Sequence, residues 1–450
     1  MLCRDRTFYK NFIRLALALM LEQAVVLSVN LADNMMLGTY SQAALSGVAA
    51  VNQIQFVYQQ AVYSIGNALI MLGSQYWGQR NTGPIRSVVS LAVRLEVAVA
   101  ALLFAAVSLF PEAALKLFTN QQVYIAEGVA YLRIMRFSYL PFALTAVMLS
   151  MMRVVETVRI ALQVSLVSLV INVTINYLLI AGNLGFPELG ARGAAIGTLT
   201  ARVVECIIVV VFVLRDRKLG MRLHHLIQHT GVLAKDFVRV AVPILTAGML
   251  WGVANAMQTV ILGHMNDNAI AAQSISNTIF LLLKVTAAGA SSAAAVIIGK
   301  TVGEGDIPRL RVYARTLQCI FVGIGATLGL TMLVIRLPLL RIYASEISHE
   351  TYELANFYMI LQACVLLFTS YQMPVNTGII RGGGDARFVL ILDIIATFTF
   401  IPLAALGGFA WKWPAEWVIV CVNIDQMLKC IPASIRVNRY RWVKKLTREG

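Results

Sequence analysis

Two carboxylates lie inside an otherwise apolar run near the beginning of the chain, where ALALMLEQAVVLSVNLADNMMLG covers residues 16–38. Glu22 and Asp33 are eleven residues apart, which in a helix is three turns plus about 20°, so they share a face, and Asn30 lies one turn before Asp33. A charge at the centre of a bilayer costs from about 2.5 to more than about 10 kcal/mol. We therefore expect this face to point into a helix bundle, where Asp33 either has a function or makes a structural hydrogen bond to a neighbouring helix.

A second polar pair occurs in the stretch INVTINYLL, where Asn172 and Asn176 are spaced i and i+4. Residues with this spacing stack on one face of a helix. Two amide oxygens beside a carboxylate suit a hard cation such as Na+. The alternative is an interhelical hydrogen bond, which in a membrane contributes about 0.6–2 kcal/mol.

The second half of the chain carries its own charges within apolar runs: Lys284, Asp393, Asp425 and Lys429. Because an unpaired lysine in lipid is costly, we expect Lys284 to face a cleft or to pair with Asp393 or Asp425, in the latter case as a static ion pair. Asp425 and Lys429 are one helical turn apart, and we expect that pair to be structural.

The composition is that of a polytopic membrane protein. Of 450 residues, 59% are hydrophobic and only 13% are charged, and the mean hydropathy is +0.75. The net charge of +15 is spread over short clusters between apolar runs, which argues against nucleic-acid binding. The six cysteines indicate neither a metal site nor a disulfide framework. The motifs of ATP binding, of serine hydrolases and of zinc proteases are absent from the sequence, so we expect neither an enzyme nor a cofactor.

The apolar runs predict an all-α integral membrane protein, because a helical span needs about 20 mostly apolar residues. Basic residues concentrate in alternate loops and at both ends of the chain, so the positive-inside rule predicts cytoplasmic termini. The twelve expected spans are 12–37, 43–72, 87–110, 126–152, 158–182, 192–214, 238–262, 268–299, 312–337, 351–380, 388–410 and 415–436.

An internal repeat relates the two halves. A shift of 225 positions places residues 36–54 over 261–279, so that Leu37-Gly38 meets Leu262-Gly263 and Asn52 meets Asn277. We expect two six-helix bundles, with domain limits 1–214 and 237–450 and a basic cytoplasmic linker at 215–236. Six helices per half give both halves one orientation, and transporters built from repeats place their substrate site between them.

The chain resembles the MATE (multidrug and toxic compound extrusion) family of antiporters, in a bacterial branch. The resemblance rests on ADNMMLGTYSQAALSGV at the end of the first span, PELGARGAAIGTLTAR entering the sixth and IIRGGGDARF after the tenth, and extends over residues 12–445. It implies a twelve-helix fold that exports drug-like, often cationic compounds as Na+ or H+ enters.

The resemblance also implies site residues. It places an ion-binding aspartate at Asp33 and a ligand at Thr198, but this chain has Asn176 where the best-described cation site has an aspartate. Asn30 and Asn172 complete the expected site, which would hold Na+ or a proton. In the second half of the chain, the position equivalent to Asp33 in the repeat is occupied by Gln258, which cannot ionise. We therefore expect one dominant ion site, in the first half.

These observations predict a monomeric, ion-coupled antiporter in the bacterial inner membrane that binds small organic compounds by alternating access. A flippase for lipid-linked oligosaccharides is the alternative, although it would need more cationic residues. The expected substrate cleft contains Glu22, Tyr58, Trp251, Lys284 and Asp393, although aromatic residues of this kind often only pack. We favour H+ over Na+, because burial among neutral groups disfavours a charged carboxylate and a second carboxylate is missing at Asn176.

Overall fold

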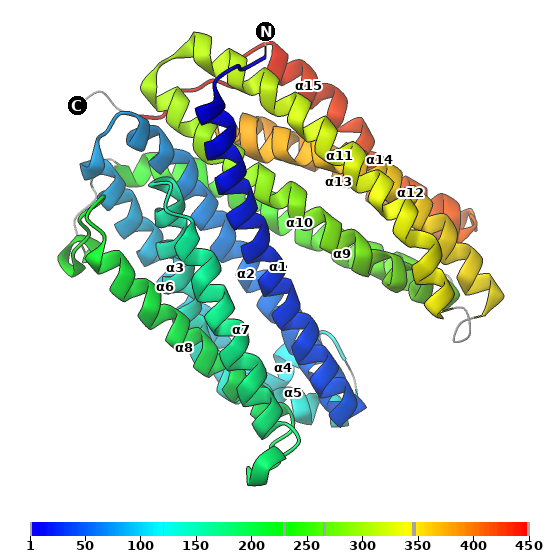
Figure 1. Ribbon diagram of the computed structural model, residues 1–450. Helices are drawn as coiled ribbons and strands as arrows, with labels where there is room; N and C mark the ends of the chain where they lie inside the picture. Colours follow the sequence, from blue (N-terminus) through cyan, green and yellow to red (C-terminus); the bar gives the residue numbers. More distant parts are fainter. Residues whose placement is uncertain are drawn as a thin grey trace. The chain divides into compact units, whose positions relative to one another are not determined.

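The computed structural model describes residues 2–119, 121–227, 231, 233–263, 267–343 and 348–447, and the regular structure in these ranges is helical (Figure 1). The chain divides into two compact units. We call Leu21–Leu245 the N-terminal unit, and Met1–Met20 with Thr246–Gly450 the C-terminal unit. The helices α1 (Arg6–Tyr40) and α9 (Leu233–Gly263) contribute to both, because each division falls inside one of them.

The N-terminal unit contains the end of α1, the start of α9 and the helices between them. These are α2 (Gln42–Gly78), α3 (Thr82–Leu109), α4 (Pro111–Lys116), α5 (Gln122–Met135), η1 (Arg136–Ser138), α6 (Tyr139–Val154), α7 (Arg159–Leu179), η2 (Asn183–Gly185), α8 (Ala191–Arg215) and η3 (Leu223–Ile227). The pairs α7–α8, α2–α3, α2–α5 and α2–α6 pack closely together.

The C-terminal unit contains the start of α1, the end of α9 and the remaining helices. These are α10 (Asp267–Glu304), α11 (Ile307–Tyr343), α12 (His349–Met373), η4 (Pro374–Ile380), α13 (Ala386–Ala405), η5 (Leu406–Ala410), α14 (Ala415–Leu428) and α15 (Cys430–Asn438). The helices α10, α11 and α12 pack against one another, and α14 packs between α12 and α13.

Each of the twelve expected spans falls on one helix or on consecutive helices. Within the described ranges, eleven segments are long and apolar enough to cross a membrane, which makes this an all-helical, multi-pass membrane protein. The expected span at 43–72 is not among the eleven, although α2 is 37 residues long. The polar content of α2 explains the difference: the helix contacts α3, α5 and α6 and buries more than half of its residues, so it needs little lipid-facing apolar surface. The domain limits 1–214, 215–236 and 237–450 remain a prediction.

Glycines allow α2 to approach its neighbour α5. A Cβ atom built on Gly47 would lie 2.7 Å from the carbonyl oxygen of Tyr124 and 2.8 Å from the backbone nitrogen of Gly128. The two backbones are therefore in contact at this level, which only small residues permit, and close approach of this kind stabilises helix pairs in membranes by van der Waals packing.

Prolines coincide with irregular helical turns in the C-terminal unit. The π-helical turn η4 begins at Pro374, and Pro402 lies four residues before the π-helical turn η5. Proline removes a backbone donor and crowds the carbonyl four residues earlier, so the helix changes its hydrogen-bond spacing there. The regular α-helix ends at Met373, directly before Pro374, and at Ala405, three residues after Pro402.

Candidate functional site

The carboxylate of Asp33 is held by a chain of neutral polar groups in the N-terminal unit. Asn176 Nδ2 donates to Asp33 Oδ1 at 2.5 Å and also lies 3.3 Å from Asn172 Oδ1, which accepts from it. Asn172 Nδ2 in turn donates to Thr198 Oγ1 at 3.2 Å. Helices α1, α7 and α8 thus meet at one point, and the structure brings together four of the five predicted ion-site residues in one hydrogen-bonded series.

A glycine on α8 makes room for Asn176. A Cβ atom on Gly197 would lie 2.1 Å from Asn176 Oδ1, well inside any real contact. Asn176 is fully buried and Asn172 is 1% exposed, and Asn176 Oδ1 has no hydrogen-bond partner among the described residues. A buried amide oxygen without a donor is costly, so this oxygen is available to a bound cation or to a protonated carboxyl group.

The series opens onto a cavity of the N-terminal unit. Its lining includes Asp33, Asn30, Asn172 and Thr198, and Tyr58 contributes from α2. The hydroxyl of Tyr58 donates to the backbone carbonyl of Tyr139 at 2.6 Å, and the tyrosine is 5% exposed, so it is a fixed part of the wall. Neutral polar side chains therefore form part of the wall around this carboxylate.

Sequence reasoning missed two charged residues of the same cavity. Arg202 Nη1 and Glu205 Oε2 form an ion pair at 2.9 Å on α8, and the Arg202 guanidinium lies 4.8 Å from the ring centroid of Phe142. Their charges offset each other, so Asp33 carries the excess negative charge. The sequence could have identified them, because Arg202 and Glu205 are charged residues inside an expected membrane span, as Glu22 is.

Glu96 on α3 is a further buried carboxyl group that the sequence reasoning missed. It is fully buried, and neither of its oxygens has a hydrogen-bond partner among the described residues. It does not line the Asp33 cavity. Its position inside the expected span 87–110 was the available signal.

Glu22 does not share the surroundings of Asp33. It is 4% exposed and forms an ion pair with Arg153, with Glu22 Oε1 2.7 Å from Arg153 Nη2. It is not part of the cavity lining. The common helix face placed both carboxylates toward the interior, but they are three turns apart and meet different helices. In this structure Glu22 pairs with Arg153 of α6, and its placement in a substrate cleft stays a prediction.

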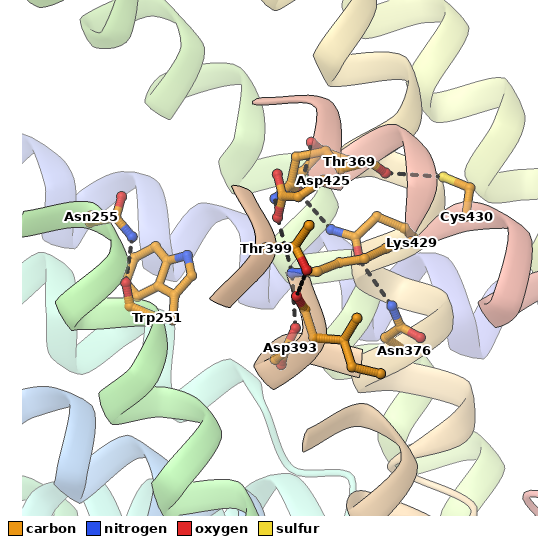
Figure 2. A network of polar contacts seen from close by, with 12 residues as sticks. Trp251, Asn255, Thr369, Asn376, Asp393, Thr399, Asp425, Lys429 and Cys430 are labelled. Atoms are coloured by element: carbon orange, nitrogen blue, oxygen red, sulfur yellow. Dashed lines mark hydrogen bonds and ion pairs between the residues drawn. The ribbon is translucent and has the colours of Figure 1, made fainter. Parts of the chain in front are cut away.

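In the C-terminal unit, one lysine holds two aspartates. Figure 2 shows Lys429 between Asp393 of α13 and Asp425 of α14, with Nζ 3.0 Å from a carboxylate oxygen of each. Gln426 Nε2 donates to Asp425 at 2.8 Å and Gln372 Nε2 donates to Gln426 Oε1 at 2.6 Å, which extends the network to α12. The expected pair Asp425–Lys429 is present, and Asp393 joins it.

Lys284 forms no ion pair with Asp393 or Asp425. It is half-buried on α10, and its Nζ lies 5.3 Å from the ring of Trp251 and 5.8 Å from that of Phe280. Lys284 and Trp251 line a second cavity, which lies within the C-terminal unit and also includes Asp425 and Gln426. The ion pair expected for Lys284 is therefore not formed among the described residues, and its place in a substrate cleft stays a prediction.

The described residues contain no group of three or more histidine, cysteine, aspartate or glutamate side chains that could hold a metal ion. A cation at Asp33 would instead take one carboxylate and the amide and hydroxyl oxygens of Asn172, Asn176 and Thr198. Oxygen donors of this kind suit Na+ in type, and a single carboxylate also suits a proton.

Comparison with known proteins adds independent information. The sequence model of the family described as MatE matches residues 18–178 and 243–406, and the two matched segments begin 225 residues apart, which is the shift of the internal repeat. The chain is 25% identical over 391 residues to "Probable multidrug resistance protein NorM" of Thermotoga maritima, covering 87% of this chain and 83% of that protein. It is 24% identical over 429 residues to the protein of the same name from Bacillus anthracis, covering 92% of each.

Solved structures share the fold. A mutant of the Vibrio cholerae MATE transporter VcmN superimposes with a TM-score of 0.87 at 18% identity, covering 97% of this chain and 98% of that one. An outward-facing multidrug resistance MATE family transporter superimposes with a TM-score of 0.85 at 17% identity, covering 96% and 95% of the two chains. At such low identity the likeness shows the helical architecture.

Proposed function

The chain belongs to the MatE family, a family of transporters and not of enzymes, and we propose that it is a secondary antiporter that exports small organic compounds from the cytoplasm in exchange for H+ or Na+. The observation that carries the proposal is the carboxylate of Asp33, held by Asn176 in a cavity whose other two charged residues, Arg202 and Glu205, pair with each other. The names of the bacterial relatives, which refer to multidrug resistance, support organic compounds as the substrates.

Coupling follows from the charge of Asp33. When Asp33 is ionised, the amide nitrogen of Asn176 donates to it. When a proton neutralises Asp33, that charge-assisted bond weakens, and with a cation present the amide must turn its oxygen toward the ion. Helices α1 and α7 therefore pack differently in the loaded and empty states. Ion and substrate exchange when each binds a different access state more tightly, without direct contact between them.

Two features favour H+ as the coupling ion. Asn176 supplies an amide where a second carboxylate would strengthen Na+ binding, and Asp33 is half-buried, which disfavours its charged form. The cation of Arg202 lies in the same cavity, although Glu205 offsets it. A site with one excess negative charge is neutralised completely by one proton.

The test is counterflow of a fluorescent organic cation in liposomes that contain the purified full-length chain. One set of liposomes has a pH gradient and no sodium, and the other has a sodium gradient at constant pH. We expect uphill transport in the first set. Transport in the second set alone would rule out the proton, and passive equilibration in both sets would contradict antiport.

The same proposal includes the setting of the protein. We propose that it is a monomer in a bacterial inner membrane with both termini in the cytoplasm, since the basic loops alternate along the chain and the relatives are bacterial. Labelling of single cysteines introduced at Lys10 and Lys445, in intact cells and in inverted vesicles, tests the orientation. Labelling of either position from outside intact cells would contradict it.

A further inference from the structure

The cavity of the C-terminal unit combines charged, amide and aromatic side chains. Its lining comes from α9, α10, α12, α13 and α14, and it includes the carboxylate of Asp425 and one ammonium group. The aromatic residues are Trp251, Phe280 and Phe400, and Lys284 supplies the ammonium group from α10. Trp251 is 42% exposed, so its ring presents open surface.

Lys284 has no acceptor for its ammonium group among the described residues of its unit. Asp393 and Asp425 both lie 3.0 Å from Lys429 Nζ, so Lys429 occupies them. Gln426 donates a further hydrogen bond to Asp425 at 2.8 Å. The rings of Trp251 and Phe280 attract the ammonium group electrostatically, but they accept no conventional hydrogen bond from its three N–H donors.

An ammonium group that lies 5.3 and 5.8 Å from two aromatic ring centroids, at the wall of a cavity, is suited to an anionic group carried on a ring system. The anion would pair with Lys284, and the ring would stack on Trp251 or Phe280. Amide donors such as Gln258 and Gln362 line the same cavity and can complete the hydrogen bonds of the anion. One cation balances one negative charge, which favours a carboxylate over a doubly charged phosphate monoester.

We propose that this cavity binds aromatic compounds that carry a carboxylate, with the ammonium group of Lys284 as the anchor of the anionic group. Whether these compounds are transported substrates depends on the transport function proposed above. These compounds extend the substrates beyond organic cations, because Lys284 has no carboxylate at ion-pair distance among the described residues, whereas Asp425, which lines the same cavity, is paired with Lys429.

The experiment is equilibrium binding of 2-naphthoate and 2-naphthamide to the purified full-length chain in detergent. The two probes have the same ring system and nearly the same size, and they differ in charge. We expect the naphthoate to bind at least about tenfold more tightly, because hydrogen bonds to a charged group are stronger than those between neutral groups. Equal binding of the two probes would overturn the proposal.

Variants assign the preference to Lys284. Lys284→Met should remove it, Lys284→Arg should keep most of it, and Lys300→Met, which removes a charge from the far end of the same helix, should leave it unchanged. A naphthoate preference that survives in Lys284→Met would overturn the assignment. Retained binding of the naphthamide by Lys284→Met shows that the cavity is still folded.

A parallel measurement separates this proposal from the transport function. Counterflow of ethidium in liposomes depends on antiport, whereas naphthoate binding in detergent does not. A naphthoate preference without ethidium counterflow would support the Lys284 site and contradict the proposed antiport. Ethidium counterflow with equal binding of the two naphthalene probes would contradict the Lys284 site and leave antiport standing.

Discussion

The amide nitrogen of Asn176 lies 2.5 Å from a carboxylate oxygen of Asp33, across 143 positions of sequence. This hydrogen bond joins α1 to α7, and Asn172 carries it on to Thr198 of α8. A change in the charge of the Asp33 carboxylate therefore alters hydrogen bonds that involve three helices. The bond makes the region testable by substitutions that alter charge, amide orientation or space.

Asp33→Asn should fold and insert but lose uphill export. The asparagine keeps the size of the side chain and can still hydrogen-bond with Asn176, but it can neither bind a proton nor supply a charge to a cation. The measurement is counterflow in liposomes under a pH gradient, with Tm as the check on folding. Export at the wild-type rate would remove Asp33 from the coupling role.

Asn176→Asp should shift the balance of coupling toward Na+. The change places a second carboxylate within hydrogen-bond distance of Asp33, and two like charges at that distance favour a bound cation or a shared proton. Stimulation of export by sodium at constant pH should appear or increase in this variant. Asn172→Asp serves as the comparison, because Asn172 hydrogen-bonds with Thr198 and lies one turn before Asn176 on α7. An Asn176→Asp variant as indifferent to sodium as the parent would contradict the prediction.

Gly197→Ala should impair export by displacing Asn176. The added Cβ would lie 2.1 Å from Asn176 Oδ1, and such overpacking costs about 1–3 kcal/mol when neighbours must move. Gly323→Ala is the matched control, because nothing lies within 4 Å of a Cβ at that position. We expect a lower Tm and slower export for Gly197→Ala only. Equal behaviour of the two variants would show that the space at Gly197 is unimportant.

Asp393→Asn should change specificity or rate without removing ion dependence. Lys429 keeps its second partner, Asp425, at 3.0 Å, so one ion pair of the network survives. Lys429→Met should be more damaging to stability, since it leaves two carboxylates without their cation. The comparison is of Tm and of transport under a pH gradient. If Asp393→Asn abolished ion coupling while Asp33→Asn spared it, the coupling site would lie in the C-terminal unit.

Glu22→Gln should lower stability and leave the identity of the coupling ion unchanged. Glu22 and Arg153 form a largely buried ion pair at 2.7 Å, and breaking such a pair from one side costs about 3–5 kcal/mol. The double variant Glu22→Arg with Arg153→Glu should recover part of the lost Tm. Loss of pH-driven transport in a Glu22→Gln variant of normal Tm would place Glu22 in the coupling path.

Hydropathy alone located most of the helices, because the bilayer requires long apolar segments with internally satisfied backbones. Hydropathy was least informative for α2, which packs against α3, α5 and α6 and contains many polar side chains. The internal repeat was likewise readable, since the two segments that match the MatE family begin at the same shift of 225 residues.

The sequence by itself determined which residues share a helix face: Asn30 with Asp33, and Asn172 with Asn176. Helical periodicity sets those relationships locally, before any helix meets another. Only the tertiary structure decided the partners across helices. Asn176 meets Asp33, Glu22 meets Arg153, and Lys429 takes the aspartates that were expected for Lys284. Each of these pairs depends on how two helices are rotated about their axes and on how deep each lies in the bundle. Close packing contacts, such as that of Gly197 against Asn176, set the rotation and the depth. Hydropathy carries no information on the rotation or on the depth.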